Sequence, residues 1–331
     1  MLKRLGIRAL ATAGILLALW GLGQSEPLIG VYHFRILMLC GISIILAVSL
    51  NIVNGFTGQF SLGHAGFMAI GAYTSAALTY YGGRPFLRML DGWGVGAPMG
   101  TTTLLAVAVA VGAVCAAAAG FGLGLPSFRL RGDYLAIVTL GFGEVVRVAL
   151  LNIDAVGGPR GLRDIPTITS FAWVYAFVIA TILISRNLAL SAHGRSLFAI
   201  REDETAAQCV GVNVMRYKIV AFTISASLAG VAGALFAHYD GYIAPNGFGF
   251  MKSIEIVVMV VLGGLGSVTG SVIAAIVLTG LPEALRAAEA YRMVVYSVLL
   301  VVLMLRRPQG ILGRRELGLD SLKALFRGKG S

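Results

Sequence analysis

The chain has 331 residues, of which 57% are hydrophobic and 12% are charged, and its mean hydropathy is +0.86. Soluble domains carry about 25% charged residues. One water-soluble domain cannot bury so much apolar surface, so these values exclude a soluble globular protein and predict an integral membrane protein. The net charge of +11 does not indicate a nucleic-acid-binding protein, because the basic residues cluster at the ends of apolar stretches.

Ten apolar stretches are candidates for membrane-spanning helices, which need about 20 apolar residues each. The first follows Lys3 and Arg4 as a signal peptide would, but no small-residue cleavage site comes after it, so we expect a retained span. The predicted fold is an all-α, polytopic transmembrane helical bundle. The stretches are 5–22, 34–53, 59–80, 101–125, 133–151, 170–187, 216–238, 252–263, 269–285 and 291–305.

Two of these stretches are irregular. The eighth is short, and the third is rich in glycine and polar residues, so we expect one or two broken or re-entrant helices, with nine spans as the alternative. The positive-inside rule predicts the orientation. With the N-terminus in the cytoplasm, 17 basic residues lie on the inner side and eight on the outer side. Both termini are then cytoplasmic, as an even number of spans requires.

The third stretch opens with polar residues, Gln59, Ser61 and His64, in a glycine-rich setting. Polar atoms in hydrocarbon cost free energy unless they are paired, so these side chains should face protein or a water-filled path. Close helix packing is the alternative to a pathway role. Small residues four apart predict helix-contact ridges in two other stretches, namely Gly112, Ala116, Gly120 and Gly124 in the fourth and Ala226, Gly230 and Ala234 in the seventh.

Charged residues within the spans are the next candidates. Glu144 and Arg147 share a helix face in the fifth span, and Glu144 lies about 16 Å along a helix from Asp133, near mid-membrane. An intramembrane charge is a functional candidate, but we favour a mutually neutralising structural pair. Glu255 in the eighth span is similar, with Lys252 as its expected partner.

Motifs of common enzyme classes are absent from the sequence. It contains no GxxxxGK[ST], GxGxxG, HExxH or GxSxG, so we predict no catalytic residue and no nucleotide bound by a P-loop. The three cysteines form no CxxC pair and the four histidines are scattered. We therefore predict no metal site, no cofactor and no enzyme activity.

The longest inner loop, at 188–215, is amphipathic. Its segment from Glu204 to Gly211 resembles the EAA…G element of ABC-importer permeases, in which a short cytoplasmic helix docks onto the ATPase subunit. The resemblance implies a coupling helix at about 194–211. Its ATPase-coupling residues would be Arg201, Glu202, Asp203, Glu204, Ala206, Ala207 and Gly211.

Longer segments at 54–73, 129–147, 194–218 and 260–270 resemble branched-chain amino-acid permeases of the LivM type. The resemblance implies a permease domain over 1–313, then a basic cytoplasmic tail over 314–331. It implies a permease subunit in a bacterial inner membrane that moves branched-chain or other apolar amino acids. The implied partners are a second related permease, two ATP-binding subunits that hold the ATP, a periplasmic solute-binding protein and the lipid bilayer, but no nucleic acid.

On this interpretation solute passes between two permeases, near the broken third and eighth spans. The translocation path would include Asn54, Gln59, Ser61, His64 and Glu144. Some relatives of the resembled family move urea or short amides, so the solute stays open, as does whether the second permease is identical. The alternative functions are an ion-coupled secondary transporter with Glu144, Arg147 and His64 as a relay, and a channel for a small neutral solute.

Overall fold

The computed structural model describes residues 30–92, 97–127 and 134–284, together with Val298, Val301, Gly310 and Gly313. The first half of this part contains α3 (Val31–Asn51), the π-helix η1 (Ile52–Phe56), α4 (His64–Gly92), α5 (Ala97–Ser127) and α6 (Tyr134–Leu151). The second half contains the 3₁₀ turns η2 (Asp154–Val156) and η3 (Gly158–Arg160), α7 (Phe171–Leu190), α8 (Ala192–Glu202), α9 (Glu204–Cys209), α10 (Val214–Asp240), the 3₁₀ turn η4 (Pro245–Phe248), α11 (Phe250–Gly263) and α12 (Val268–Ala284).

The all-α polytopic fold is confirmed for the described residues. Six of their helical segments are long and apolar enough to cross a membrane, and the helix at 268–282 is a shorter apolar one. The six segments are Val31–Phe56, Met99–Ser127, Tyr134–Leu151, Phe171–Leu190, Val214–Asp240 and Pro245–Gly263. The count of ten spans is not confirmed. Predicted spans 5–22 and, apart from Val298 and Val301, 291–305 lie outside the described residues, as does the tail at 314–331.

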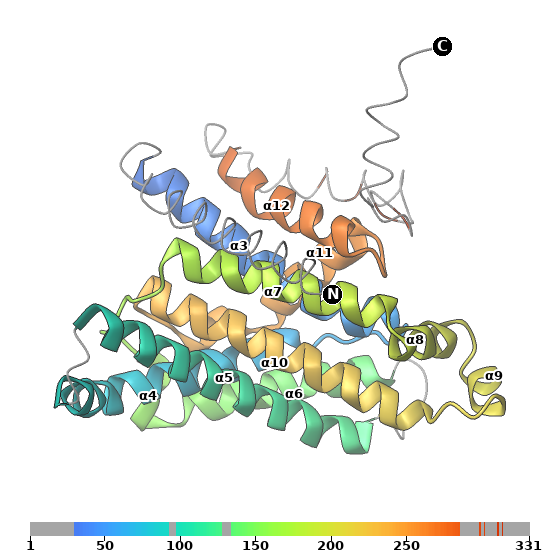
Figure 1. Ribbon diagram of the computed structural model, residues 1–331, viewed down its shortest axis with the longest axis horizontal. Helices are drawn as coiled ribbons and strands as arrows, with labels where there is room; N and C mark the ends of the chain where they lie inside the picture. The colour runs from blue at the N-terminus through green and yellow to red at the C-terminus, as the bar shows by residue number, and fades with distance from the viewer. Residues whose placement is uncertain are drawn as a thin grey trace, which may run out of the picture.

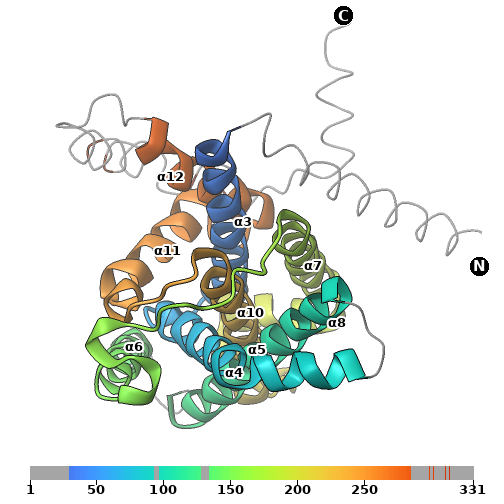
Figure 2. The same ribbon diagram turned by 90° about the vertical axis from the view of Figure 1, so that its left-hand side faces the viewer.

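The long helices run side by side along the molecule, while α3 and α12 lie across one side of the bundle (Figure 1). Seen from the end, α10 occupies the interior among α3, α4, α5 and α7 (Figure 2), and it packs against all four. Every residue of α10 from Leu228 to Leu235 is buried. A helix that is apolar all round suits this central position.

Small residues let α4, α5 and α10 approach closely, as the sequence predicts for α5 and α10. A Cβ atom added to Gly230 of α10 would lie 2.5 Å from the Cβ of Ala116 and 2.8 Å from the carbonyl oxygen of Gly112. One added to Gly71 of α4 would lie 2.2 Å from the carbonyl oxygen of Gly230. Close packing of backbones is a usual basis of helix association in membranes. Lipid tails are as apolar as the helix surfaces, so the hydrophobic effect does not drive the helices together.

The third stretch is interrupted at its start, whereas the eighth forms a continuous helix that ends where the sequence predicts. The third predicted stretch begins at residue 59, but its helix, α4, begins five residues later at His64. Residues 57–63 before it are not helical. Ahead of it, α3 ends in the π-helical turn η1. The eighth span, α11, ends at Gly263, and Gly264 and Gly266 adopt positive φ angles of 107° and 90° before α12 begins.

We predict that Gly230→Ala lowers the thermal stability of the purified chain, because overpacking costs about 1–3 kcal/mol and exceeds what alanine gains as a helix former. Gly122→Ala is the matched control, since no atom lies within 4 Å of its added Cβ. Melting followed by size-exclusion chromatography in detergent compares the two variants. Equal melting temperatures would contradict the packing account.

Candidate functional site

The two interruptions lie against each other. The side-chain oxygen of Asn51, a buried residue at the end of α3, accepts a hydrogen bond of 2.8 Å from the amide of Gly266. A Cβ atom on Gly55 would lie 2.4 Å from that same amide nitrogen, so only glycine allows this contact. The break after α3 and the break after α11 therefore form one unit, which we call the double break (residues 51–63 and 264–267).

Arg201 of α8 ties the double break to the inner loop. Its guanidinium donates a 2.6 Å hydrogen bond to the carbonyl oxygen of Gly55 and a 3.4 Å one to that of Leu265. The ring of Phe198, also on α8, packs edge-on against Phe56 with centroids 5.2 Å apart. The predicted coupling segment thus contacts the segment after α3 and the segment after α11 at once.

The predicted coupling segment forms two short helices, α8 and α9, rather than one. Asp203 separates them, because its backbone is extended and its side chain accepts from the amides of Thr205 and Ala206 at 2.8 and 3.0 Å. Such an N-cap satisfies the first donors of a new helix. Gly211 then ends the segment with a φ of 85°, a conformation that glycine adopts without strain.

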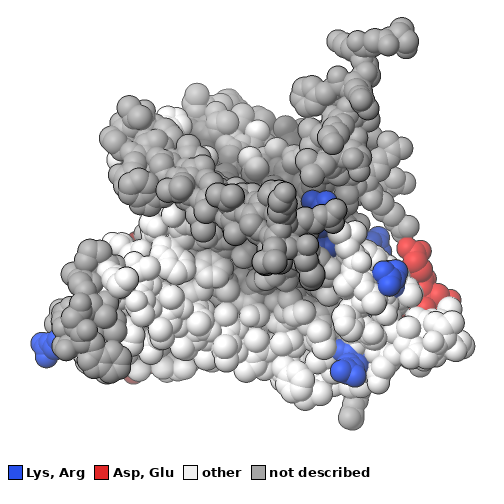
Figure 3. All heavy atoms as spheres, in the orientation of Figure 1, with Lys and Arg blue, Asp and Glu red and all other residues white. Residues whose placement is uncertain are grey.

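The α8–α9 unit has one buried side and one exposed side. Ala207 is buried in a small cluster with Ile200 and Val214. Glu204 forms an ion pair of 2.7 Å with Lys218 of α10. The other predicted coupling residues, Glu202, Asp203, Ala206 and Gly211, are exposed. Charged side chains gather at this end of the molecule, while the described middle of the same face is uncharged (Figure 3).

Three of the predicted path residues come together at the double break. The backbone amide of Ser61 donates to the side-chain oxygen of Asn54 at 3.1 Å, and both residues are buried. His64 lies 2.8 Å from the hydroxyl of Ser49 and is 2% exposed. Among the described residues, no partner reaches the buried side-chain nitrogen of Asn54 or the buried side-chain oxygen of Gln59. These two atoms therefore keep unused hydrogen-bonding capacity at the double break.

Glu144 lies elsewhere, at the junction of α6 with η4 and α11. It pairs with Arg147 at 2.7 Å, and its second oxygen accepts from the amide of Phe250 at the start of α11. Arg147 in turn donates to the side chain of Asn246 at 3.3 Å. A carboxylate is stabilising at a helix N-terminus, so these contacts fit the structural role that the sequence favours.

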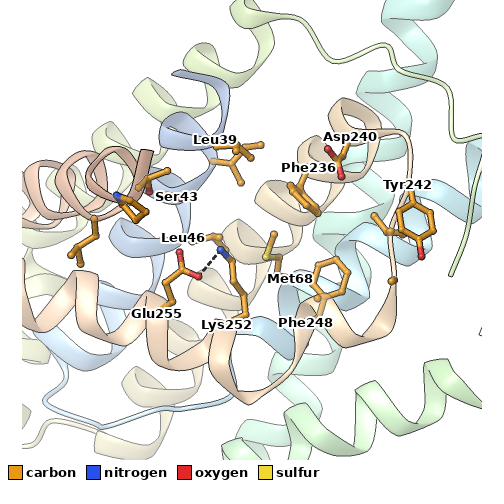
Figure 4. Close-up of a pocket in the computed structure, with 17 residues that line it drawn as sticks. Leu39, Ser43, Leu46, Met68, Phe236, Asp240, Tyr242, Phe248, Lys252 and Glu255 are labelled. Carbon is orange, nitrogen blue, oxygen red and sulfur yellow. Dashed lines mark hydrogen bonds and ion pairs between the residues drawn. The ribbon is translucent and has the colours of Figure 1, made fainter. Parts of the chain in front are cut away.

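A cavity of about 410 Å³ lies between α3, α10, α11 and α12 (Figure 4). Its lining includes Lys252 and Glu255, which form the expected ion pair at 2.9 Å, and Asp240 at the end of α10. The sequence does not reveal this cavity, because its walls come from four helices that are far apart along the chain. Two acidic residues, Asp240 just after the seventh predicted span and Glu255 in the eighth, are the signal that could have suggested it.

The described residues form several apolar helices that are long enough to cross a membrane, and a charged helical unit lies at one end of them. These features define a multi-pass α-helical membrane protein. The family model described as the permease component of branched-chain amino acid transport systems matches residues 32–304. The chain therefore belongs to this family, and it is a LivM-type permease.

Relatives support the assignment. The high-affinity branched-chain amino acid transport system permease protein LivM of Escherichia coli K12 is 39% identical over 82% of this chain and 68% of its own length. A probable LivM of Methanocaldococcus jannaschii is 27% identical over 71% and 76%. The permease protein LivH of E. coli K12 is 34% identical over 56% and 60%. No solved structure matches the chain.

We predict that Arg201→Met destabilises the chain, because it leaves the carbonyl oxygens of Gly55 and Leu265 without their charged donor. Hydrogen bonds to charged groups contribute about 1.5–3 kcal/mol. Arg195→Met is the control, since Arg195 is exposed on the same helix. Thermal melts of both purified variants measure the effect, and a loss no larger in the Arg201 variant than in the control would contradict the contact's role.

We predict that Glu144→Gln lowers thermal stability by about 1 kcal/mol, the scale of a part-exposed ion pair, without changing which solutes are transported. Arg147→Gln should cost a similar amount, and the double variant should cost less than the two single variants together. Thermal melts and uptake competition measure these effects. A stable Glu144→Gln protein with altered solute preference would instead show that Glu144 contacts solute.

Proposed function

We propose that this chain is one permease subunit of an ABC importer that moves branched-chain or other apolar amino acids across a bacterial inner membrane. The observation that carries the proposal is the α8–α9 unit, which exposes acidic residues on one side and contacts the double break through Arg201 on the other. This arrangement suits a segment that receives force from a partner and passes it to the membrane helices. Family membership supports the same function.

The contacts define two routes for that force. In one, the ion pair between Glu204 and Lys218 links α9 to the start of α10, the central helix of the bundle. In the other, Arg201 links α8 to the carbonyl groups of the double break. Closure of the ATP-binding partners would move α8–α9, and both routes would shift the interrupted spans so that access alternates between the two sides. No bond of the solute changes on this chain.

The partners follow from the same proposal. Two ATP-binding subunits dock on α8–α9 and hydrolyse ATP, and a periplasmic solute-binding protein docks at the opposite end. A second permease related to LivH completes the pathway, as the 34% identical relatives suggest. The termini and α8–α9 lie in the cytoplasm. Solute passes next to the double break, where Asn54, Gln59 and Ser61 supply polar atoms, with His64 behind them.

The secondary-transporter alternative gains no support from the described contacts. Its relay needs His64, Glu144 and Arg147 to be connected. His64 is hydrogen-bonded to Ser49, whereas Glu144 and Arg147 pair with each other and contact the η4–α11 segment. An ATP-driven mechanism also gives α8–α9 a role that a solitary transporter would not.

We predict that Glu204→Ala uncouples the transporter, because it removes the link between α9 and Lys218. In proteoliposomes that hold the whole complex, leucine uptake per ATP hydrolysed should fall about fivefold, since a part-exposed ion pair contributes on the order of 1 kcal/mol. Arg186→Ala, at an exposed position near the end of α7 and outside α8–α9, is the control. Normal uptake in the Glu204 variant would count against this coupling route.

We predict that Thr205→Cys crosslinks to an ATP-binding subunit, because Thr205 is exposed in the first turn of α9. An impermeant maleimide added to intact spheroplasts should leave this cysteine unlabelled. The control is the same reagent after the membrane is opened. Labelling from outside would invert the proposed orientation of the chain.

A further inference from the structure

The cavity between α3, α10, α11 and α12 combines both signs of charge with an apolar wall. Lys252 and Glu255 lie one helical turn apart on α11, and their side chains are 29% and 38% exposed. Asp240 reaches the same cavity from α10 and also pairs with Arg35 of α3 at 3.0 Å. A cation and two carboxylates therefore border one cavity, each with a partner but none fully buried.

The rest of the lining is largely apolar. Leu39, Ile42 and Leu46 occupy one face of α3, spaced by three and four residues, and Phe236 of α10 and Met68 of α4 extend that wall. Figure 4 shows the Lys252–Glu255 pair on one side of the cavity, with Phe236 and Leu39 across from it. The cavity thus has a charged side and an apolar side, as a ligand with a charged head and an apolar tail would need.

One polar group in the lining lacks a partner. The hydroxyl oxygen of Thr279 on α12 is buried, and no hydrogen-bond partner reaches it among the described residues. A buried hydroxyl without a partner is costly, so its presence points to a ligand or water in the cavity. The volume of about 410 Å³ also lies in the range of small-molecule sites.

We propose that this cavity is a binding site for the zwitterion of an apolar α-amino acid on its way through the permease. Lys252 binds the carboxylate, Glu255 and Asp240 bind the ammonium group, and the aliphatic side chain lies against Leu39 and Phe236. The proposal rests on the proposed function and adds a site within this subunit. Asp240 is the last residue of α10, whereas Lys218, which pairs with α9, lies near its start. The cavity is therefore at the end of α10 away from α8–α9, where a binding protein would deliver solute.

The same chemistry separates amino acids from the other solutes that the sequence leaves open. Urea has no charge to match Lys252 or Glu255, and it has no apolar part for the wall. Placing it there would remove water from the ion pair without replacing the lost interactions. The cavity therefore favours an amino-acid permease over a urea or amide permease.

The test uses the complete complex in proteoliposomes, with leucine-loaded binding protein in excess. Lys252→Met and Glu255→Gln should each lower leucine uptake per ATP hydrolysed about tenfold, because each removes a charge that the zwitterion would match. Ile276→Phe, on the exposed side of α12 and outside the cavity, is the control. The double variant Lys252→Glu, Glu255→Lys keeps the ion pair but reverses it, and its uptake should stay low.

Unchanged uptake per ATP in both single variants would overturn the proposal, and so would recovery of uptake in the reversed pair, which would mean that the pair is only structural. If the wild-type complex neither moves leucine nor hydrolyses ATP in response to it, the proposed function fails instead.

For variants that do not fold, Ser43→Cys in a chain without its three native cysteines gives a second measurement. Leucine, but not urea, should slow maleimide labelling of this cavity position. Labelling at the same rate with and without leucine would overturn the proposed site.

Discussion

The contact between Arg201 and the double break determines how the rest of this molecule is organised. An interrupted membrane span frees backbone carbonyl and amide groups, and each costs several kcal/mol if it is left unpaired in a membrane. Here Arg201 supplies donors to Gly55 and Leu265, while Asn51 accepts from Gly266. The residue that completes these two breaks belongs to the loop that also presents α9. In the proposed mechanism, the local stability of this region and its response to a partner therefore depend on the same side chain.

The central helix α10 connects the proposed coupling unit α8–α9 with the proposed binding cavity. It begins beside α9, where Lys218 pairs with Glu204, and it ends at Asp240 in the cavity wall. Gly230 and its small neighbours hold this helix against α4 and α5 at very short range. Packed interiors transmit displacement because they have little free volume. A shift of α8–α9 can therefore reach the cavity through one continuous helix, as well as through the double break.

The sequence predicts the positions of the helices better than the contacts between them. Periodic small residues identify the α5–α10 contact correctly, since that signal is local to each helix. The glycine and polar residues of the third stretch predict that its helix is interrupted, but not that α4 begins at His64, because a helix boundary depends on which backbone groups find partners. The division of the coupling segment at Asp203 could have been predicted, because aspartate is favoured at helix N-caps. By contrast, the bond from Arg201 to Gly55 joins residues 146 positions apart, and the cavity combines Leu39 with Lys252; no local pattern encodes such contacts.

The most direct test of the account measures leucine uptake into proteoliposomes that contain this chain with a LivH-type permease, the ATP-binding subunits and a solute-binding protein. Uptake is recorded with ATP, without ATP, and with a proton or Na⁺ gradient in place of ATP. The account predicts uptake that requires ATP and every partner. Uptake by this chain alone, driven by an ion gradient without ATP, would contradict it.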